Sequence, residues 1–116
     1  MRRARPAQQG MTGGAYLTIA NGTEQSDTLI SISTEVAAMA EVHESFQQED
    51  GLSGMRPAGK LPIEPRSLLE LKPGAYHIML MQVHRSLVAG DTISATLHFG
   101  RNDRLQVPIP VRQNRN

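Results

Sequence analysis

The sequence predicts an all-β domain, an antiparallel β-sandwich or small barrel. Short segments of alternating apolar and polar residues follow one another, separated by turns that contain Gly, Pro, Asn or Asp, and no long segment has the period of an amphipathic helix. The length of 116 residues and the hydrophobic fraction of 39% suit one globular domain with a core of moderate size.

Each expected strand is bounded by a turn signal. Residues 15–21 end at Asn21-Gly22, which predicts a hairpin. Further strands are expected at 28–33, in the second half of 36–45, and at 67–71, 76–83, 92–99 and 105–111. Pro108 and Pro110 place the last of these strands at a sheet edge, because proline cannot donate a ladder hydrogen bond. The nearly continuous apolar character of 76–83 indicates that both its faces are covered.

The segments between the strands are predicted to be irregular. Residues 47–54 are expected to form a flexible loop, and residues 56–65, with three prolines, an extended connector. A tight turn is expected at Lys72-Pro73-Gly74, with a positive φ at Gly74. Residues 1–13 are predicted to be a flexible arm, residues 14–112 the folded domain and residues 113–116 a tail.

The composition excludes several functions. The chain has no cysteine, which rules out disulfides, a thiolate nucleophile and iron–sulfur clusters. A net charge of +1 and 3% aromatic residues argue against nucleic-acid binding. There is no apolar run of about 18 residues to span a membrane. The basic N-terminus lacks the apolar stretch of a signal peptide, so the chain is either cytosolic or a trimmed mature form.

One pattern could carry metal chemistry. His77 and Met79 are two residues apart in a predicted strand and therefore project from the same face. His43 lies in an earlier strand-like segment, and Met55 follows a glycine-containing loop. Two imidazoles and two thioethers favour Cu(I) over harder ions, provided that the imidazoles are neutral. From the pattern alone, packing of His77 and Met79 in the core is the stronger interpretation.

The sequence between Gly14 and Val111 resembles the periplasmic copper chaperone family PCuAC. The resemblance rests on Ala15-Tyr16-Leu17-Thr18-Ile19, on Val42-His43-Glu44, on Met55-Arg56-Pro57, on LELKPGAYHIMLM at residues 69–81 and on Gly90-Asp91-Thr92. The combined KPG-x-YH-x-MLM segment is its most specific part. As in the family, 21 residues separate Met55 from His77. Eleven residues lie between His43 and Met55, one more than is usual, and Ser45 and Phe46 stand where the family often has a further methionine.

The resemblance implies a cupredoxin-like, Greek-key β-sandwich that binds one Cu(I) through His43, Met55, His77 and Met79. Family members are exported, so it also implies a periplasmic protein whose signal peptide has been removed. The expected role is delivery of copper to an acceptor such as the dinuclear copper centre of cytochrome c oxidase, with another assembly chaperone as a second kind of acceptor. We expect a monomer and no enzymatic activity. The alternatives are a metal-free interaction module, or copper storage and detoxification in the periplasm.

The sequence also suggests how the site would be built. We expect it near the surface, with His77 and Met79 as its rigid half and Met55 as the ligand that detaches first. Glu44 could orient the His43 ring, and Met81 is either a core residue or a reserve ligand. His84 and His98 are assigned no metal role. The acidic residues Glu41, Glu44, Glu49 and Asp50 are interpreted as a solvated rim near the first ligand.

Overall fold

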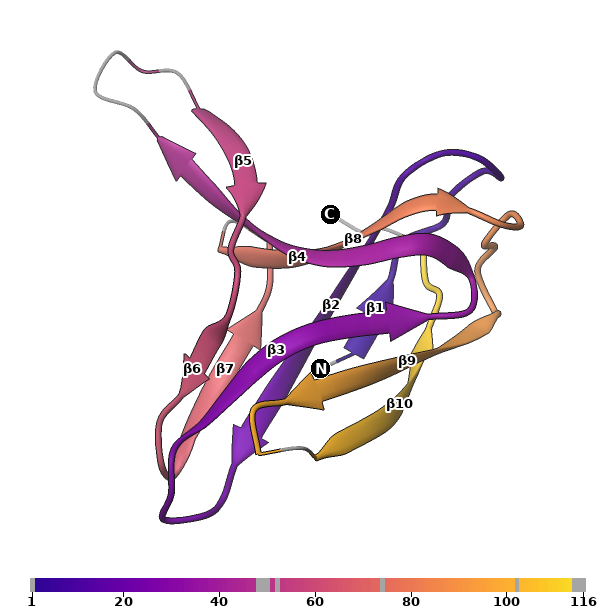
Figure 1. Cartoon of the computed structure of the whole chain (residues 1–116). Coiled ribbons are helices and arrows are strands. Elements are labelled where there is room, and N and C mark those ends of the chain that lie inside the picture. Colours follow the sequence, from indigo (N-terminus) through magenta and orange to yellow (C-terminus); the bar gives the residue numbers. More distant parts are fainter. Residues whose placement is uncertain (1, 48–50, 52, 74, 102, 114–116) are drawn as a thin grey trace.

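The computed structural model describes residues 2–47, 51, 53–73, 75–101 and 103–113, and within these ranges it is an antiparallel β-sandwich. One sheet has the strand order β1-β2-β8-β4-β5, with β7 also paired to β2, and the other has the order β10-β9-β3-β6 (Figure 1). The strands are β1 (Arg2–Ala4), β2 (Gly13–Asn21), β3 (Asp27–Thr34), β4 (Ala37–Gln47), β5 (Ser53–Pro57), β6 (Leu61–Ile63), β7 (Ser67–Leu71), β8 (Tyr76–Val83), β9 (Thr92–Phe99) and β10 (Arg104–Pro110). The expected all-β, antiparallel sandwich is confirmed.

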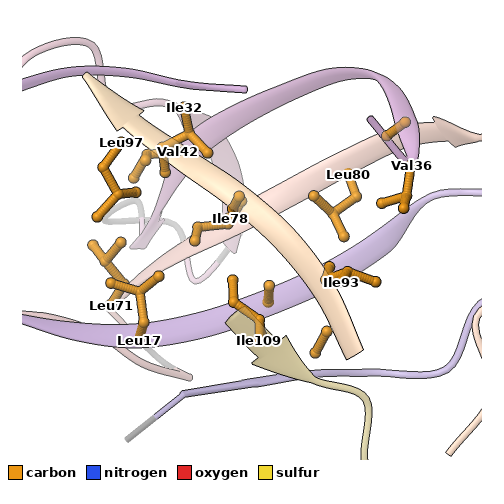
Figure 2. Packing of buried hydrophobic residues seen from close by; sticks show 14 of the residues in the cluster. Leu17, Ile32, Val36, Val42, Leu71, Ile78, Leu80, Ile93, Leu97 and Ile109 are labelled. Carbon is orange, nitrogen blue, oxygen red and sulfur yellow. The ribbon is translucent and has the colours of Figure 1, made fainter. Parts of the chain in front are cut away.

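The core lies between the two sheets and is built by alternation along each strand. Ile78 and Leu80 of β8 point into it beside Leu17 of β2, and side chains of the second sheet close it from the opposite side (Figure 2). The expected inward face of β9 is confirmed, with Ile93, Ala95 and Leu97 buried and Phe99 packed against the cluster; the other large buried members include Leu29, Leu71, Val83, Leu87, Ile109 and Val111. His77 and Met79, which alternate with Ile78 and Leu80 along β8, must therefore face outward.

Strands β7 and β8 lie along the same edge of β2. Leu17 pairs with Arg2 on one side and Leu71 on the other, and Ala15 pairs with Ala4 and Ile78 in the same way. The segment around Lys72 therefore connects two strands that pair in succession with the same side of β2, and it is not the turn of a hairpin. The expected positive φ at Gly74 falls outside the described residues, as do parts of the 47–54 loop and of the 113–116 tail.

The expected hairpin at Asn21-Gly22 is wrong. Strands β2 and β3 belong to different sheets, so the connection carries the chain from one layer of the sandwich to the other. The Asn21 side chain explains the choice of residue, because its amide donates hydrogen bonds to the carbonyl oxygens of Gln25, Ile63 and Glu64 at 2.9, 3.2 and 3.1 Å. The Asn21 side chain therefore stabilises a crossover between the two sheets. A local turn signal such as Asn-Gly does not distinguish such a crossover from a hairpin.

The interpretation of the N-terminal residues as a flexible arm is also wrong for those the structure describes. Arg2–Ala4 pairs with β2, Ala4 is fully buried, and the Arg112 amide donates to the Ala4 carbonyl at 3.0 Å. Further on, Ala7 exchanges backbone hydrogen bonds with Leu87 at 3.0 and 2.8 Å. The segment is ordered because its backbone groups find partners in β2 and in the 87–88 and 111–112 regions.

The expectation that both faces of 76–83 are covered is wrong, because Met79 and Met81 are half-buried and Gln82 is exposed. Three other expectations are met with small changes. The 36–45 segment is strand from Ala37 onward, β10 lies at a sheet edge as expected, and the 56–65 connector contains the end of β5 and the short strand β6. Strands β4 and β5 extend beyond the body of the sandwich as a two-stranded projection (Figure 1). In the part of the chain that is described, no helix is both long and apolar enough to cross a membrane.

Candidate metal centre

The two histidines of the candidate site lie directly opposite each other on neighbouring strands. Strands β4 and β8 are antiparallel, and their register pairs His43 with His77. Directly paired residues project from the same face of a sheet, and Val42 and Ile78 beside them point into the core. Both imidazoles are therefore on the outer face, where their ring centroids are 6.1 Å apart with the planes tilted by 48°.

The two methionines reach the same face from two different strands. Met79 follows His77 by two residues along β8. The residue that pairs with Met79 on β2 is Gly14, which has no side chain to cover the methionine. Met55 lies on β5 opposite Ser45, which is two residues beyond His43. The additional residue between His43 and Met55 has therefore not moved Met55 to the other face, because the β4–β5 register compensates for it.

Three of the four side chains line one open pocket of about 440 Å³. Met55, His77 and Met79 contribute to its wall, together with residues of the N-terminal segment and of the β7–β8 connection: Arg5, Pro6, Thr12, Gly13, Gly14, Tyr16, Ser45 and Pro73. His43 is not part of this wall and lies beside it, opposite His77. Met55 is 55% exposed and His77 only 8%, so the pocket combines a buried imidazole with a thioether at the surface.

The surroundings of His77 favour its neutral form. Burial lowers the pKa of His77 below its ordinary value of 6.5, and the nearby His43 and Arg5 lower it further. The Nε2 atom of His43 is buried and has no hydrogen-bond partner among the described residues. A buried imidazole nitrogen without a partner is costly, and a neutral imidazole can relieve this cost by binding a metal ion.

Two arginines near the N-terminus, which the sequence did not single out, lie over the same aromatic ring, and one of them, Arg5, lines the pocket. The guanidinium carbons of Arg3 and Arg5 lie 5.5 and 5.3 Å from the centroid of the Tyr16 ring, at cation–π distance. The Arg5 amide also donates to the Gly14 carbonyl at 2.9 Å, which fixes Arg5 against β2. The alternation of Arg3-Ala4-Arg5 was the available signal, since it places both arginines on one face of a short strand.

Glu44 does not orient His43. As the next residue along β4 it projects from the opposite face, and its carboxylate accepts a hydrogen bond of 2.8 Å from Arg56 Nε. The Arg56 guanidinium also lies 4.8 Å from the Phe46 ring centroid. These contacts stabilise the projection on the side away from the candidate site. Glu49 and Asp50 of the expected acidic rim fall outside the described residues.

The other histidines and Met81 do not line the pocket. His84 is exposed beyond the end of β8, and His98 is on the second sheet, 3.1 Å from Ser33 Oγ through its Nε2. Met81 is half-buried and pairs with Met39. Within the described ranges, no group of three or more His, Cys, Asp or Glu side chains could hold a metal ion.

Fold and pocket together define a cupredoxin-like β-sandwich of the PCuAC type. The apo PCuAC domain from PmoF1 superposes with a TM-score of 0.78 over 97% of this chain and 90% of that chain, at 18% identity. The copper-bound PCuAC domain from PmoF2 gives 0.76 over 97% and 89%, also at 18% identity. The solution structure of CuI-DR1885 from Deinococcus radiodurans gives 0.73 over 98% and 78%, at 27% identity.

The chain belongs to the LpqE-like family, a PCuAC-type family whose profile matches residues 1–111 and whose description includes the word lipoprotein. A relative in Leifsonia xyli subsp. xyli, Lxx21020, also has that word in its name and is 29% identical over 91% of this chain. Protein RP573 of Rickettsia prowazekii is 27% identical over 83% of this chain. The chain spans 63% and 53% of the lengths of these two relatives.

Proposed function

We propose that this protein is an extracytoplasmic copper chaperone that binds one Cu(I) through His43, Met55, His77 and Met79. The observation that carries the proposal is the convergence of these residues, from β4, β5 and β8, on one face of the first sheet. Two imidazoles that share one ion through bonds of about 2 Å have centroids about 5 to 6 Å apart, and the separation increases with the angle between the two bonds. The spacing of 6.1 Å between the rings of His43 and His77 permits such an ion.

The ligand chemistry favours Cu(I). Thioethers are soft ligands that bind Cu(I) well and harder divalent ions poorly, and an electron-transfer copper site would need the cysteine that this chain lacks. The lowered pKa of His77 favours the neutral ring that a metal ion requires. Two structurally similar proteins, the copper-bound PmoF2 domain and CuI-DR1885, have structures with copper or Cu(I), which supports copper as the ion bound here.

The mixture of buried and exposed ligands supports delivery rather than permanent retention. His77 and Met79 belong to the central strand β8, whereas Met55 is largely exposed on the projecting hairpin. An acceptor can displace an exposed thioether first and take the ion by stepwise ligand exchange. A site without thiolates also loses its ion readily to a thiolate-rich acceptor, such as the dinuclear copper centre of cytochrome c oxidase.

An extracytoplasmic location, the periplasm where the host has one, agrees with the same chemistry. The word lipoprotein in the family description points to an exported protein, and a cysteine-free site cannot be inactivated by disulfide formation. Its oxidation hazard is instead conversion of methionine to the sulfoxide.

Cu(I) titration of the apo protein against a competing chelator, under anaerobic and reducing conditions, tests the proposed ligands. Met55→Leu, His77→Ala and Met79→Leu should each weaken binding by tenfold or more, which corresponds to about 1.4 kcal/mol or more. Met11→Leu and His84→Ala are matched controls, because both residues are exposed and lie outside the pocket wall. Wild-type affinity in all three ligand variants would overturn the proposed site.

Delivery is tested separately by mixing the Cu(I)-loaded protein with an apo copper domain of cytochrome c oxidase. Transfer at a rate above that of spontaneous dissociation supports a chaperone. Tight binding of Cu(I) without such transfer would contradict delivery to this acceptor and favour storage.

A further inference from the structure

A second pair of methionines lies on the same outer face, outside the pocket. In the β4–β8 register, Met39 is directly opposite Met81, as His43 is opposite His77. The two strands run side by side across the first sheet (Figure 1). Met81 follows Met79 by two residues on β8, so it projects from the face that carries His77 and Met79.

The exposure of this pair is not that of core residues. Met39 is 53% exposed and Met81 is half-buried, whereas the neighbouring pair on the opposite face, Ala40 with Leu80, packs in the core. Folding therefore gains little from the Met39 side chain. Exposure of this large apolar side chain, on the face that carries the candidate metal site, is explained if its sulfur binds a metal ion.

The register allows both sulfurs to reach one ion. Directly opposed residues have Cβ atoms about 4.5–5.5 Å apart, and the unbranched methionine side chain has three rotatable bonds with which to adapt. Met79 is about 7 Å further along the strand, at the rise of about 3.3–3.4 Å per residue. Glu41 pairs with Met79 and projects from the same face, so it adds a negative charge that attracts a cation.

We propose that Met39 and Met81 form a second, weaker Cu(I) site, from which the ion passes to and from the four-ligand site by way of Met79. Two thioethers without an imidazole hold the ion less tightly than four ligands, and this suits a position that an ion occupies briefly. The passage is a ligand exchange in which the copper stays Cu(I): Met79 binds as Met39 leaves, and no electron or proton is transferred. The passage, but not the binding, rests on the proposed function.

The binding is tested by NMR of the full chain labelled with 13C in the methionine methyl groups, under anaerobic and reducing conditions. The first equivalent of Cu(I) should shift the methyl signals of Met55 and Met79, and the second those of Met39 and Met81. Met39→Leu should retain the first binding event and weaken the second by tenfold or more. Met11→Leu is the matched control, because Met11 is 59% exposed and precedes β2.

The outcomes separate the two proposals. Shifts at Met39 and Met81 without any at Met55 and Met79 support the second site and overturn the four-ligand site. If the second equivalent shifts no methyl group, or shifts Met11 as strongly as Met39, the second site is overturned.

The passage is tested by the rate of Cu(I) uptake from a coloured chelator complex. Met39→Leu should slow uptake severalfold while the affinity of the first equivalent stays unchanged. An unchanged rate overturns the passage. Met81→Leu should give the same result as Met39→Leu, and it provides a second variant on the other strand.

Discussion

The two faces of β8 differ completely although their residues alternate along one short strand. Ile78 and Leu80 point into the sandwich and are buried among aliphatic side chains, whereas His77 and Met79 point outward into the pocket. Folding and the candidate function are thus assigned to neighbouring residues. Substitutions at adjacent positions of β8 should therefore affect different properties, stability on the inner face and copper binding on the outer face. Four experiments test how far this separation holds.

The largest effect is expected on the inner face. Leu80→Ala removes a fully buried side chain and leaves a cavity, which should lower the free energy of unfolding by about 2–5 kcal/mol. Urea denaturation of the apo protein measures this loss. A decrease below about 1 kcal/mol would mean that the core does not depend on this face of β8.

On the outer face, Met79→Leu should weaken Cu(I) binding while leaving the stability of the fold nearly unchanged. Leucine has a similar volume, so the free energy of unfolding of the apo protein should change by less than about 1.5 kcal/mol. The affinity for Cu(I) should fall by at least tenfold, about 1.4 kcal/mol, because a sulfur ligand is lost. Equal losses of stability and copper affinity in Met79→Leu and Leu80→Ala would contradict the separation of the two faces.

The pH dependence of stability sharpens the same comparison. The pKa of His77 is lowered in the folded protein, so as pH falls through 6.5 the unfolded chain takes up a proton before the folded protein does. Protonation then favours the unfolded chain, so the apo protein should become progressively less stable as pH falls from about 7.5 through 6.5 to the lowered pKa of folded His77, with no contribution from His77 at higher pH.

Urea denaturation at several pH values measures this slope. His77→Gln should flatten it, whereas His84→Gln, at an exposed histidine, should leave it as in the wild type. If His77→Gln has the wild-type slope, His77 is not the group that couples folding to pH.

The smallest effect is expected on the far side of the projecting hairpin. Arg56→Ala removes an ion pair with Glu44 and a contact with the Phe46 ring, and the Arg56 side chain itself is 60% exposed to solvent. Such contacts contribute up to about 1 kcal/mol each, and the loss should shrink at high salt. Copper affinity should change less than threefold because Arg56 projects away from the pocket. A loss of affinity as large as that of Met79→Leu would show that the hairpin side chains jointly position Met55.

The sequence patterns predicted the strands better than their connections. Alternation in β9 and the prolines of β10 predicted an inward face and an edge position, and both are confirmed. The Asn21-Gly22 signal failed because it describes only a local turn, and the turn does not specify which sheet the next strand joins. The N-terminal strand was missed because Arg2–Ala4 is too short to show a convincing period.

By itself, the sequence determined that His77 and Met79 share a face, because this follows from the two-residue period of any strand. It also determined that any metal site in this chain is free of thiolates, because the chain has no cysteine. Only the tertiary structure decided that His43 lies opposite His77, that Glu44 pairs with Arg56 and that Arg5 lines the pocket. These contacts depend on the pairing of strands distant in sequence, and that register is set by the packing of the whole sandwich.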